Sequence, residues 1–385
     1  MPRDSRGSTR ASDAARPTVL VIGPVPPPAF GVAKATQLML DSATLAERLQ
    51  IEHMDISDRR GVSNIGRFDW WNVWLAFRHM ARLALMLSRA RPRVTMLTAS
   101  QGKLGLLRDG AFGALAVGFR SRLVVYLRGS GYAEIPATQG RLAGKILRSL
   151  FRHSASVIVL GQSLVPMAVS VYPSARVVVV PNGCPPAVPP ESCGARDESH
   201  PIVSYIGRLG RAKGIDEALL AARKLAPRFP GIEFILGGGW DSPEYEQHVR
   251  AFIEREGLSE VVHLPGPVSL QPKSDLLARS WVHIVPSHTE GQPWVILEAM
   301  SAGVPVVATD TGAIAETVHD GVTGFVVPVG DADALADRIA EVLRDHDLWK
   351  QMSDQTLARY EAHFTMERSH TLLADELSRV AAGDE

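Results

Sequence analysis

"WVHIVPSHTEGQPWVILEAMSAGVPVVATD", residues 281–310, predicts two apolar strands joined by a loop and a short helix. Both flanking runs, 281–287 and 304–310, are continuously apolar, which is typical of parallel strands that are buried on both faces of a sheet. Between them, a loop that carries Glu290 leads to Pro293, which suits the first position of a helix. The stretch therefore predicts a parallel sheet with this loop at the carboxyl end of a strand.

Apolar strands alternate with helical patterns in two separate series. The first series has its strands at 18–23, 93–98, 122–129, 156–160 and 176–181, with an amphipathic stretch over 32–49. The second has them at 202–207, 232–239, 261–266, 281–287, 304–310 and 324–328, and helical patterns follow from Ala334. We predict an α/β protein of two tandem doubly wound Rossmann-like domains facing a central cleft, where a large ligand would bind.

Composition shifts set the expected domain limits. Residues 1–16 lack an apolar core and are predicted to form a disordered tail rather than a signal peptide. The N-terminal domain is expected over 17–183, a Pro-, Gly- and Ser-rich linker over 184–200, and the second domain over 201–362. Residues 363–385 predict a helix that packs back on the first domain.

The two halves of the chain have opposite net charges, although the whole chain is neutral. Of 385 residues, 45% are hydrophobic and 21% charged, as in ordinary soluble globular proteins. The formal net charge is zero, yet residues 1–185 hold 24 Lys and Arg against 10 Asp and Glu, and the remainder 17 against 31. Two cysteines, Cys184 and Cys193, are too few for a disulfide scaffold or Cys-rich zinc site, which favours a reducing cytoplasm. No uncharged run reaches the ~18–20 residues of a membrane span.

Two glutamates flank the predicted helix start. The free amides of residues 291–294 would face the cleft with the positive end of the helix, which suits a phosphate or a sugar hydroxyl. Glu298 would lie roughly 7–8 Å further along the axis than the loop. Glu290 and Glu298 could therefore hold hydroxyls at opposite ends of an elongated ligand with an anionic middle. The alternative is that Glu290 is a loop acid and Glu298 a solvated helix residue.

Basic residues near two other predicted strand ends could bind that anionic middle. "YIGRLGRAKG" (205–214) carries Arg208 and Lys213, which could neutralise a diphosphate leaving group, with Arg211 as a substitute. The alternative is that these are solvated loop charges. In "GPVPPPAFGVAKA" (23–35), Gly31 would let backbone approach a ligand and Lys34 adds charge. This loop lacks the three-glycine dinucleotide fingerprint, which counts against a nicotinamide or flavin enzyme.

Taken together, these motifs resemble the retaining glycosyltransferases of family 4, which have the GT-B fold. The resemblance runs from about Thr18 to Arg368. Its motifs are the Gly31 loop, "PNG" (181–183), "GRLGRAKG" (207–214), "GGG" (237–239), "EGQPWVILEAMSAGVPVVATDTGAIAE" (290–316) and "GVTGFVVP" (321–328). The two glutamates seven residues apart, followed by A-x-G-x-P-V-V, are the most specific part.

The resemblance implies a role for each motif. The position of Glu298 would bind the nucleotide ribose, that of Glu290 the donor sugar, and those of Arg208 and Lys213 the diphosphate. Base contacts are expected near Gly238 and Pro267–Val268. The implied donor-binding set is Gly31, Arg208, Lys213, Gly238, Val268, Glu290, Gly291, Gln292, Pro293, Trp294 and Glu298. Transfer would retain the anomeric configuration, with attack on the face from which the leaving group departs. No metal or cofactor is expected besides a UDP- or GDP-linked sugar.

One position departs from the family pattern. Many members have a histidine near the end of the strand that here reads "VVYLRGSGYAEI" (124–135), where this chain has Arg128. Histidine titrates and arginine stays charged, so Arg128 is predicted to contact the donor sugar or an anionic acceptor. Glu290, Arg208, Lys213 and Arg128 form the candidate catalytic set. The alternative is that Arg128 only frames the loop; Glu134 is a weaker acceptor-site candidate.

The acceptor side is predicted from composition. Residues 67–93 join three tryptophans to six arginines, a pattern typical of helices on anionic membrane surfaces. The alternative for this helix is that it buries its Trp and Leu side chains against the sheet and leaves the arginines solvated. The basic first domain favours an anionic or lipid-linked acceptor, and the alternative for the charge split is that opposite domain charges favour cleft closure. We predict a cytoplasmic enzyme, peripheral on the inner face of the plasma membrane, acting on a saccharide or lipid-linked acceptor in polysaccharide or glycolipid assembly. The alternatives are a non-catalytic GT-B partner subunit and a nucleotide-sugar epimerase or hydrolase. No recognised nucleic-acid-binding module is present.

Overall fold

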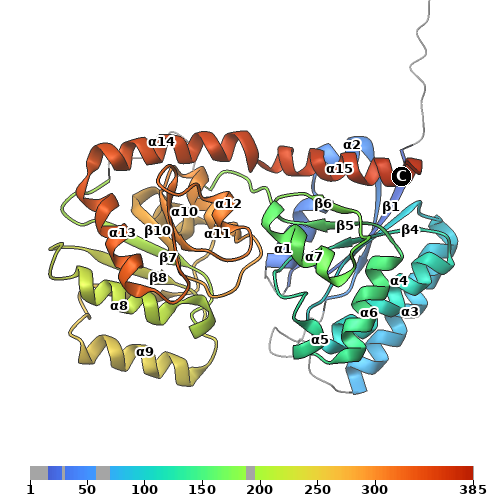
Figure 1. Cartoon of the computed structure of the whole chain (residues 1–385), viewed down its shortest axis with the longest axis horizontal. Helices are drawn as coiled ribbons and strands as arrows, with labels where there is room; N and C mark the ends of the chain where they lie inside the picture. Colours follow the sequence, from blue (N-terminus) through green and yellow to red (C-terminus); the bar gives the residue numbers. More distant parts are fainter. Residues whose placement is uncertain (1–15, 28–30, 58–69, 188–195, 385) are drawn as a thin grey trace, which may run out of the picture.

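Two parallel six-stranded sheets, each with helices on both faces, lie side by side in the molecule (Figure 1). The computed structural model describes residues 16–27, 31–57, 70–187 and 196–384. This architecture confirms the predicted α/β class with two doubly wound domains. The predicted tail, apart from Arg16, and the middle of the predicted linker lie outside the described residues. In the described part, no helix is long and apolar enough to cross a bilayer.

The first sheet has the strand order β2-β1-β3-β4-β5-β6, and all its neighbouring strands are parallel. Its strands are β1 (Thr18–Gly23), β2 (Gln50–Asp55), β3 (Val94–Thr98), β4 (Arg122–Tyr126), β5 (Ser154–Val159) and β6 (Val177–Val179). The connecting helices are α1 (Gly31–Leu40), α2 (Ala43–Arg48), α3 (Trp70–Ala90), α4 (Lys103–Gly118), α5 (Ile135–Thr138), α6 (Arg141–Arg152), η2 (Gln162–Leu164) and α7 (Val165–Val171).

Two elements of the first domain differ from the sequence expectation. Strand β2, "QIEHMD", lies at the sheet edge with only Met54 fully buried, so it lacks the continuous apolar run that identifies the other strands. The amphipathic stretch over 32–49 forms two helices instead of one. The chain breaks at Ser42, whose side chain accepts a hydrogen bond from the Leu45 amide and so begins α2.

The second sheet has the order β12-β11-β10-β7-β8-β9, again parallel throughout. Its strands are β7 (Ile202–Ile206), β8 (Glu233–Gly237), β9 (Val262–Gly266), β10 (Ser280–Val285), β11 (Val306–Thr309) and β12 (Gly324–Val327). Its helices are η4 (Arg211–Lys213), α8 (Ile215–Leu225), α9 (Pro243–Arg255), α10 (Leu270–Arg279), α11 (Trp294–Ser301), α12 (Ile314–Thr317) and α13 (Ala332–Arg344). Every residue of β7, β10 and β11 is buried, as continuous apolar strands predict.

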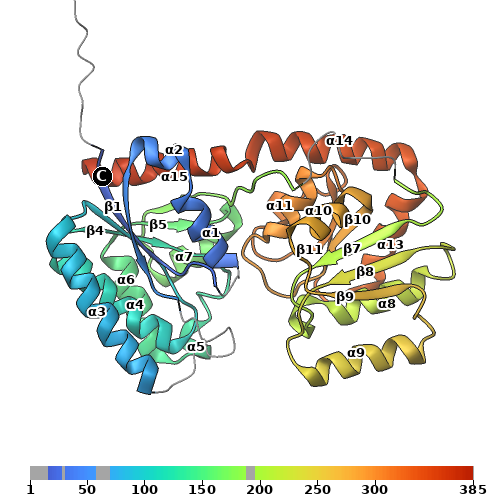
Figure 2. The same ribbon diagram turned by 180° about the vertical axis from the view of Figure 1, so that it is seen from behind.

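The last two helices connect the domains. Helix α14 (His346–His363) packs against α11 of the second domain, and α15 (Met366–Ala382) crosses to lie beside α2 of the first (Figures 1 and 2). Leu373, Leu377 and Val380 of α15 belong to the first hydrophobic core. Arg48 and Asp375 form an ion pair of 2.6 Å between α2 and α15. The C-terminal helix is thus an integral part of the first domain.

Buried His370 makes the stability of the contact between α15 and the first domain depend on pH. Its Nδ1 lies 2.7 Å from Ser42 Oγ, and burial, together with the nearby Arg128 charge, lowers the pKa of His370 to about 4. Because the folded pKa lies below the ordinary value of about 6.5, the stability contribution of the neutral ring is complete above pH ~6.5 and is lost towards pH 4. We expect the free energy of unfolding to fall in that window by up to about 1.4 kcal/mol per pH unit from this group.

Urea unfolding of the wild type and of His370→Gln between pH 7.5 and 4.5 measures this contribution. The pH dependence should be shallower in His370→Gln than in the wild type and in the matched variant His153→Gln, which changes an exposed histidine. Parallel curves for all three proteins would contradict the assignment.

Candidate active site

A cleft of about 370 Å³ lies between the two domains, at the carboxyl ends of strands from both sheets. The first domain contributes residues from the start of α1, the end of β4 and the "PNG" motif. The second contributes the turns after β7 and β10 and the start of α11. The lining residues are Gly31, Val32, Arg128, Asn182, Tyr205, Ile206, Gly207, Arg208, Lys213, Val285, Ser287, Glu290, Gly291, Gln292, Pro293, Trp294 and Val295.

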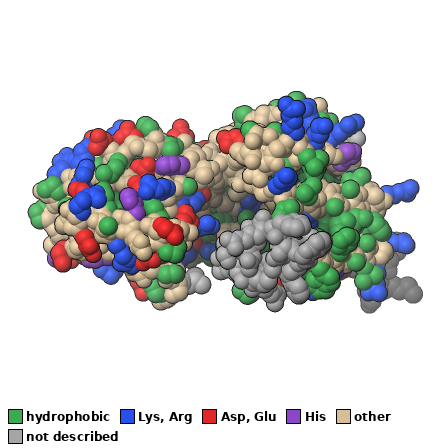
Figure 3. Space-filling model, turned by 90° about the horizontal axis from the view of Figure 1, so that it is seen from below, with side chains coloured by type: hydrophobic (Ala, Val, Ile, Leu, Met, Phe, Trp, Pro, Cys, Tyr) green, Lys and Arg blue, Asp and Glu red, His purple; other side chains and the backbone are tan. Residues whose placement is uncertain are grey.

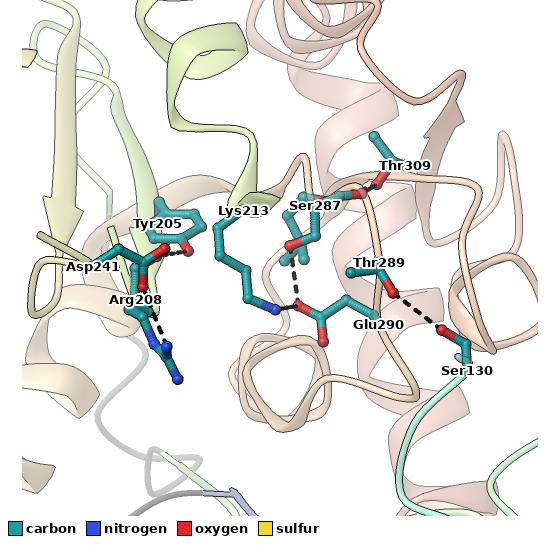
Figure 4. A network of polar contacts seen from close by, with 10 residues as sticks. Ser130, Tyr205, Arg208, Lys213, Asp241, Ser287, Thr289, Glu290 and Thr309 are labelled. Carbon is teal, nitrogen blue, oxygen red and sulfur yellow. Dashed lines mark hydrogen bonds and ion pairs between the residues drawn. The ribbon is translucent and has the colours of Figure 1, made fainter. Parts of the chain in front are cut away.

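Glu290 and Lys213 form an ion pair in this cleft. Lys213 Nζ lies 2.6 Å from Glu290 Oε1, and Ser287 Oγ donates to the same oxygen at 3.0 Å (Figure 4). Gly214 turns the chain from η4 into α8 with a φ of +72°, and a Cβ there would lie 1.9 Å from the carbonyl oxygen of Pro286. This close passage of η4 by the end of β10 brings the lysine to the glutamate, a pairing that the sequence analysis did not predict.

Arg208 lines the same cleft but remains largely open to solvent. Its side chain is 61% exposed, and its Nη1 lies 3.3 Å from Asp241 Oδ1 at the edge of the cleft (Figure 4). The guanidinium therefore keeps most of its donors available for an incoming anion. Arg211 does not substitute for it, because this side chain pairs with Asp216 at 3.0 Å and lies over the ring of Tyr245.

Helix α11 begins at Trp294, not at Pro293 as predicted. Pro293 has the φ of a helical residue, −65°, but its ψ of 129° is extended, which makes it the residue that precedes the helix. The preceding turn is held by Gln292, whose side-chain oxygen accepts from the Asn182 amide at 2.7 Å and whose side-chain nitrogen donates to Thr317 at 3.0 Å. These buried bonds fix the loop at the cleft independently of the helix.

Glu298 is buried, with 4% of its surface exposed, so its description as a solvated helix residue is excluded. Two lysines bind one of its oxygens: Lys273 of α10 at 2.6 Å and Lys34 of α1 at 2.8 Å. Burial alone would raise the pKa of Glu298, but the two ammonium groups outweigh it and hold the pKa below its usual range. Lys34 also lies 5.2 Å from the centre of the Trp294 ring, so this pair joins the two domains beside the cleft.

Arg128 lies in the cleft on the first-domain side. Its Nη1 donates to Asn182 Oδ1 at 2.6 Å, and its guanidinium lies 4.0 Å from the centre of the Tyr126 ring. Asn182 in turn donates to the carbonyl of Gln292 at 2.9 Å. A Cβ on Gly291 would come within 2.8 Å of the Arg128 carbonyl oxygen, so the domains meet here through backbone. Arg128 is therefore part of the cleft wall.

Other predicted positions divide into two groups. Gly31 lines the cleft, and a Cβ there would meet nothing within 4 Å. Gly238 and Val268 do not line the described cleft. A Cβ on Gly238 would lie 1.6 Å from the Gly207 carbonyl oxygen, and Val268 packs against Gly237. Glu134 is exposed at the start of α5 and is not among the lining residues.

Sequence reasoning missed the roles of Lys273 and Asn182. Lys273 is one of several polar residues in α10, and only the packing of α10 against α11 side chains reveals its bond to Glu298. The signal for Asn182 was the "PNG" motif, which indicates a special loop but not its partners. Among the described residues, no three His, Cys, Asp or Glu side chains are grouped so that they could hold a metal ion.

Contacts outside the cleft also hold the domains together. Glu316 of α12 accepts hydrogen bonds from the Gln162 amide at 2.8 Å and from Ser163 Oγ at 2.6 Å, both in the turn after β5. A Cβ on Gly161 would collide with the Glu316 carboxylate, at 1.9 Å. The Ser130 and Thr289 hydroxyls, one from each domain, lie 3.2 Å apart (Figure 4). Polar contacts at two separate places thus hold the domains together.

The family model that matches this chain covers mainly the second domain. Residues 194–359, less than half of the chain, match the family model described as glycosyl transferases group 1. This segment contains Arg208, Lys213, Glu290 and Glu298. The chain is also 33% identical over 185 residues to the putative colanic acid biosynthesis glycosyltransferase WcaL of Salmonella typhimurium. That match covers 46% of this chain and 44% of WcaL, so it spans less than half of the relative's length.

Comparisons with solved structures cover nearly the whole chain. Sucrose-phosphate synthase from Thermosynechococcus elongatus superposes with a TM-score of 0.76 at 17% identity, over 96% of this chain and 100% of that one. Anabaena HepE, in complex with UDP-glucose, gives a TM-score of 0.71 at 18% identity, over 94% and 99%. These likenesses, with the two facing sheets, show that the protein has the GT-B fold.

Removing the Glu298 carboxylate should destabilise the fold. In Glu298→Gln, the ammonium of Lys273, whose side chain is only 14% exposed, would lose its counterion in a buried place. We expect the free energy of unfolding to fall by about 3 kcal/mol, as when one partner of a buried pair is removed.

Denaturant unfolding measures this loss. The matched control is Glu341→Gln, which breaks a surface pair with Arg338 and should cost at most about 0.5 kcal/mol. Equal losses for the two variants would show that the Glu298 cluster does not stabilise the interface.

Proposed function

We propose that this protein is a retaining glycosyltransferase of family 4 that transfers a sugar from a nucleoside diphosphate donor to an acceptor without a metal ion. The observation that carries the proposal is the cleft arrangement of Lys213, Arg208 and Glu290. Two cations face a space large enough for a ligand, and a carboxylate lies beside one of them. The family-model match over 194–359 and the GT-B fold support the same chemistry.

The cations would bind the diphosphate. In the free protein, Lys213 neutralises Glu290, and Arg208 is held at the rim by Asp241. A diphosphate that enters between them would attract both cations and stabilise the charge that develops as the glycosidic bond breaks. Glu290, already fixed by Ser287, would then accept hydrogen bonds from donor-sugar hydroxyls. Glu298, kept ionised by its lysines, would accept from the ribose hydroxyls.

Retention of configuration would follow from attack on the face from which the diphosphate departs. The pairing of Glu290 with Lys213 and Ser287 supports a hydrogen-bonding role for it rather than a covalent one. Arg128 would contact the donor sugar or an anionic acceptor from the opposite wall, where the family often has histidine. Its bond to Asn182 would orient the guanidinium.

The acceptor would be a saccharide or a lipid-linked precursor in polysaccharide assembly, in the cytoplasm. The name of the relative WcaL, a putative glycosyltransferase of colanic acid biosynthesis, supports this acceptor class. A non-catalytic partner subunit is the second candidate, favoured only by Arg128 at the histidine position.

Purified full-length protein tests the proposal. Thermal shifts with UDP, GDP and ADP should identify one preferred nucleotide, because a ligand that binds the native state stabilises it. The corresponding sugar donor should then release free nucleoside diphosphate, with EDTA present, and NMR of the product should show a retained anomeric centre. Donor binding without any release would support the partner-subunit reading, and an inverted product would contradict the mechanism.

Lys213→Ala tests whether Lys213 stabilises the diphosphate leaving group. Loss of the ammonium removes electrostatic stabilisation of the leaving group, so we expect kcat/KM to fall by about 10²–10³-fold. Arg211→Ala is a matched control in the same turn, because Arg211 pairs with Asp216 outside the cleft and should leave kcat/KM within about threefold. Equal effects of the two changes would argue against a diphosphate at Lys213.

Gly31→Ala probes the donor side of the first domain. The added methyl group meets no atom of the described residues within 4 Å, so folding should be unaffected or slightly more stable, by about 0.5–1 kcal/mol. If the donor approaches this backbone, its KM should rise at least several-fold. Gly118→Ala in α4, which also has open space around it, should leave KM unchanged. An unchanged KM in Gly31→Ala would place the donor away from α1.

A further inference from the structure

Helices α3, α4 and α6 lie side by side over one face of the first sheet, on the side away from α15 (Figures 1 and 2). We refer to the described outward side of these helices, with the residues that directly follow α3 and α4, as the α3–α4–α6 face. Its helices carry several basic side chains and almost no acidic ones. Helices α3 and α6 contain no Asp or Glu, and the single acid of α4, Asp109, is fully buried and bonded to Arg108. The described face therefore presents no exposed carboxylate.

Large apolar side chains are concentrated on the same face. Eleven are exposed in the described part of the chain, and seven of them lie here. These are Trp74, Phe77 and Leu85 of α3, Leu107 and Val117 of α4, Phe119 after α4, and Leu142 of α6. Helix α3 buries Leu83 and Leu87 against the sheet while Phe77 is 73% exposed. The expectation that this helix hides its apolar residues in the core is therefore correct for only one of its sides.

Exposed basic residues surround these apolar side chains. They are Arg78, Arg82, Arg89, Arg91, Arg93, Lys103, Arg120, Arg141, Lys145, Arg148 and Arg152. None of them forms an ion pair with a residue in the described ranges. On the second domain, by contrast, exposed arginines such as Arg223 and Arg250 pair with neighbouring glutamates. Figure 3 shows the same asymmetry: acidic side chains crowd the second domain, on the left, and are sparse on the first.

Three of these arginines converge on a pocket. Arg91, Arg93 and Arg120 line a pocket of about 400 Å³ between the C-terminal ends of α3 and α4, next to Phe119. Arg91 and Arg120 have positive φ angles of 45° and 61°, a backbone conformation that costs a non-glycine residue energy. Their mutual repulsion has no acidic partner among the pocket residues, so a phosphate group would relieve it.

We propose that the α3–α4–α6 face binds the surface of an anionic lipid bilayer. Exposed apolar side chains would enter the boundary between headgroups and acyl chains, while the arginines contact headgroup phosphates. A continuous anionic surface complements a face with spread cations and no exposed acid. The pocket of Arg91, Arg93 and Arg120 would take one phosphate group. This proposal stands on surface chemistry and does not require the proposed transferase activity.

Co-sedimentation of the full chain with vesicles tests it. The wild type should pellet with phosphatidylcholine vesicles that contain roughly one-third phosphatidylglycerol, and much less with pure phosphatidylcholine. Phe77→Ser with Arg82→Glu should weaken partition to the anionic vesicles by about tenfold or more. The matched control on the second domain, Leu220→Ser with Lys350→Glu, changes an exposed apolar and a basic residue and should bind as the wild type does.

Three results would overturn the proposal: no pelleting with anionic vesicles, equal loss in both variants, or binding that Phe77→Ser alone leaves untouched. Soluble polyphosphate provides a further arm. If it binds as tightly as the vesicles and Phe77→Ser has no effect, the face is a site for a soluble polyanion rather than a membrane. Far-UV circular dichroism and the thermal shift with nucleotide confirm that each variant is folded. Because vesicle binding is read without turnover, its failure is distinguishable from a failure of the transferase proposal.

Discussion

Two carboxylates near the domain interface are each paired with lysines from separate elements. Glu290 meets Lys213 from the turn after β7, and Glu298 meets Lys273 of α10 and Lys34 of the other domain. Taking charges out of water is costly unless a partner of opposite sign is in place. The positions of three helices and two loops are therefore coupled to these contacts.

Most of the fold follows from a simple property of the sequence. A strand buried on both faces must be largely apolar, and strands such as β1, β3, β7 and β10 show such a run. Strand β2 lacks such a run because it lies at an edge of the sheet, where Gln50 and Glu52 can point away from the core. The start of α11 is displaced by one residue because the buried bonds of Gln292, not the proline ring, determine where the loop ends.

Residues that belong to a recognisable sequence motif could be predicted to line the cleft. Residues that reach the site only through the packing of distant elements could not. Gly31, Arg128, Arg208, Lys213 and the loop from Glu290 to Trp294 all reach the cleft. Lys273, by contrast, depends on how α10 packs, which no local pattern records. At Gly238, the absent side chain makes room for the Gly207 carbonyl, a backbone constraint that the "GGG" pattern alone does not distinguish from a ligand contact.

The return of α15 to the first domain affects how the chain is made. Leu373, Leu377 and Val380 complete a hydrophobic core whose strands lie between Thr18 and Val179. A ribosome must therefore translate the whole second domain before the first can bury its last apolar surface. During synthesis, the sheet surface that α15 will cover stays exposed in the first domain until α15 has been made. By then the second domain already has all of its own strands. Folding of this protein is thus expected to finish out of chain order, with the N-terminal half sealed last.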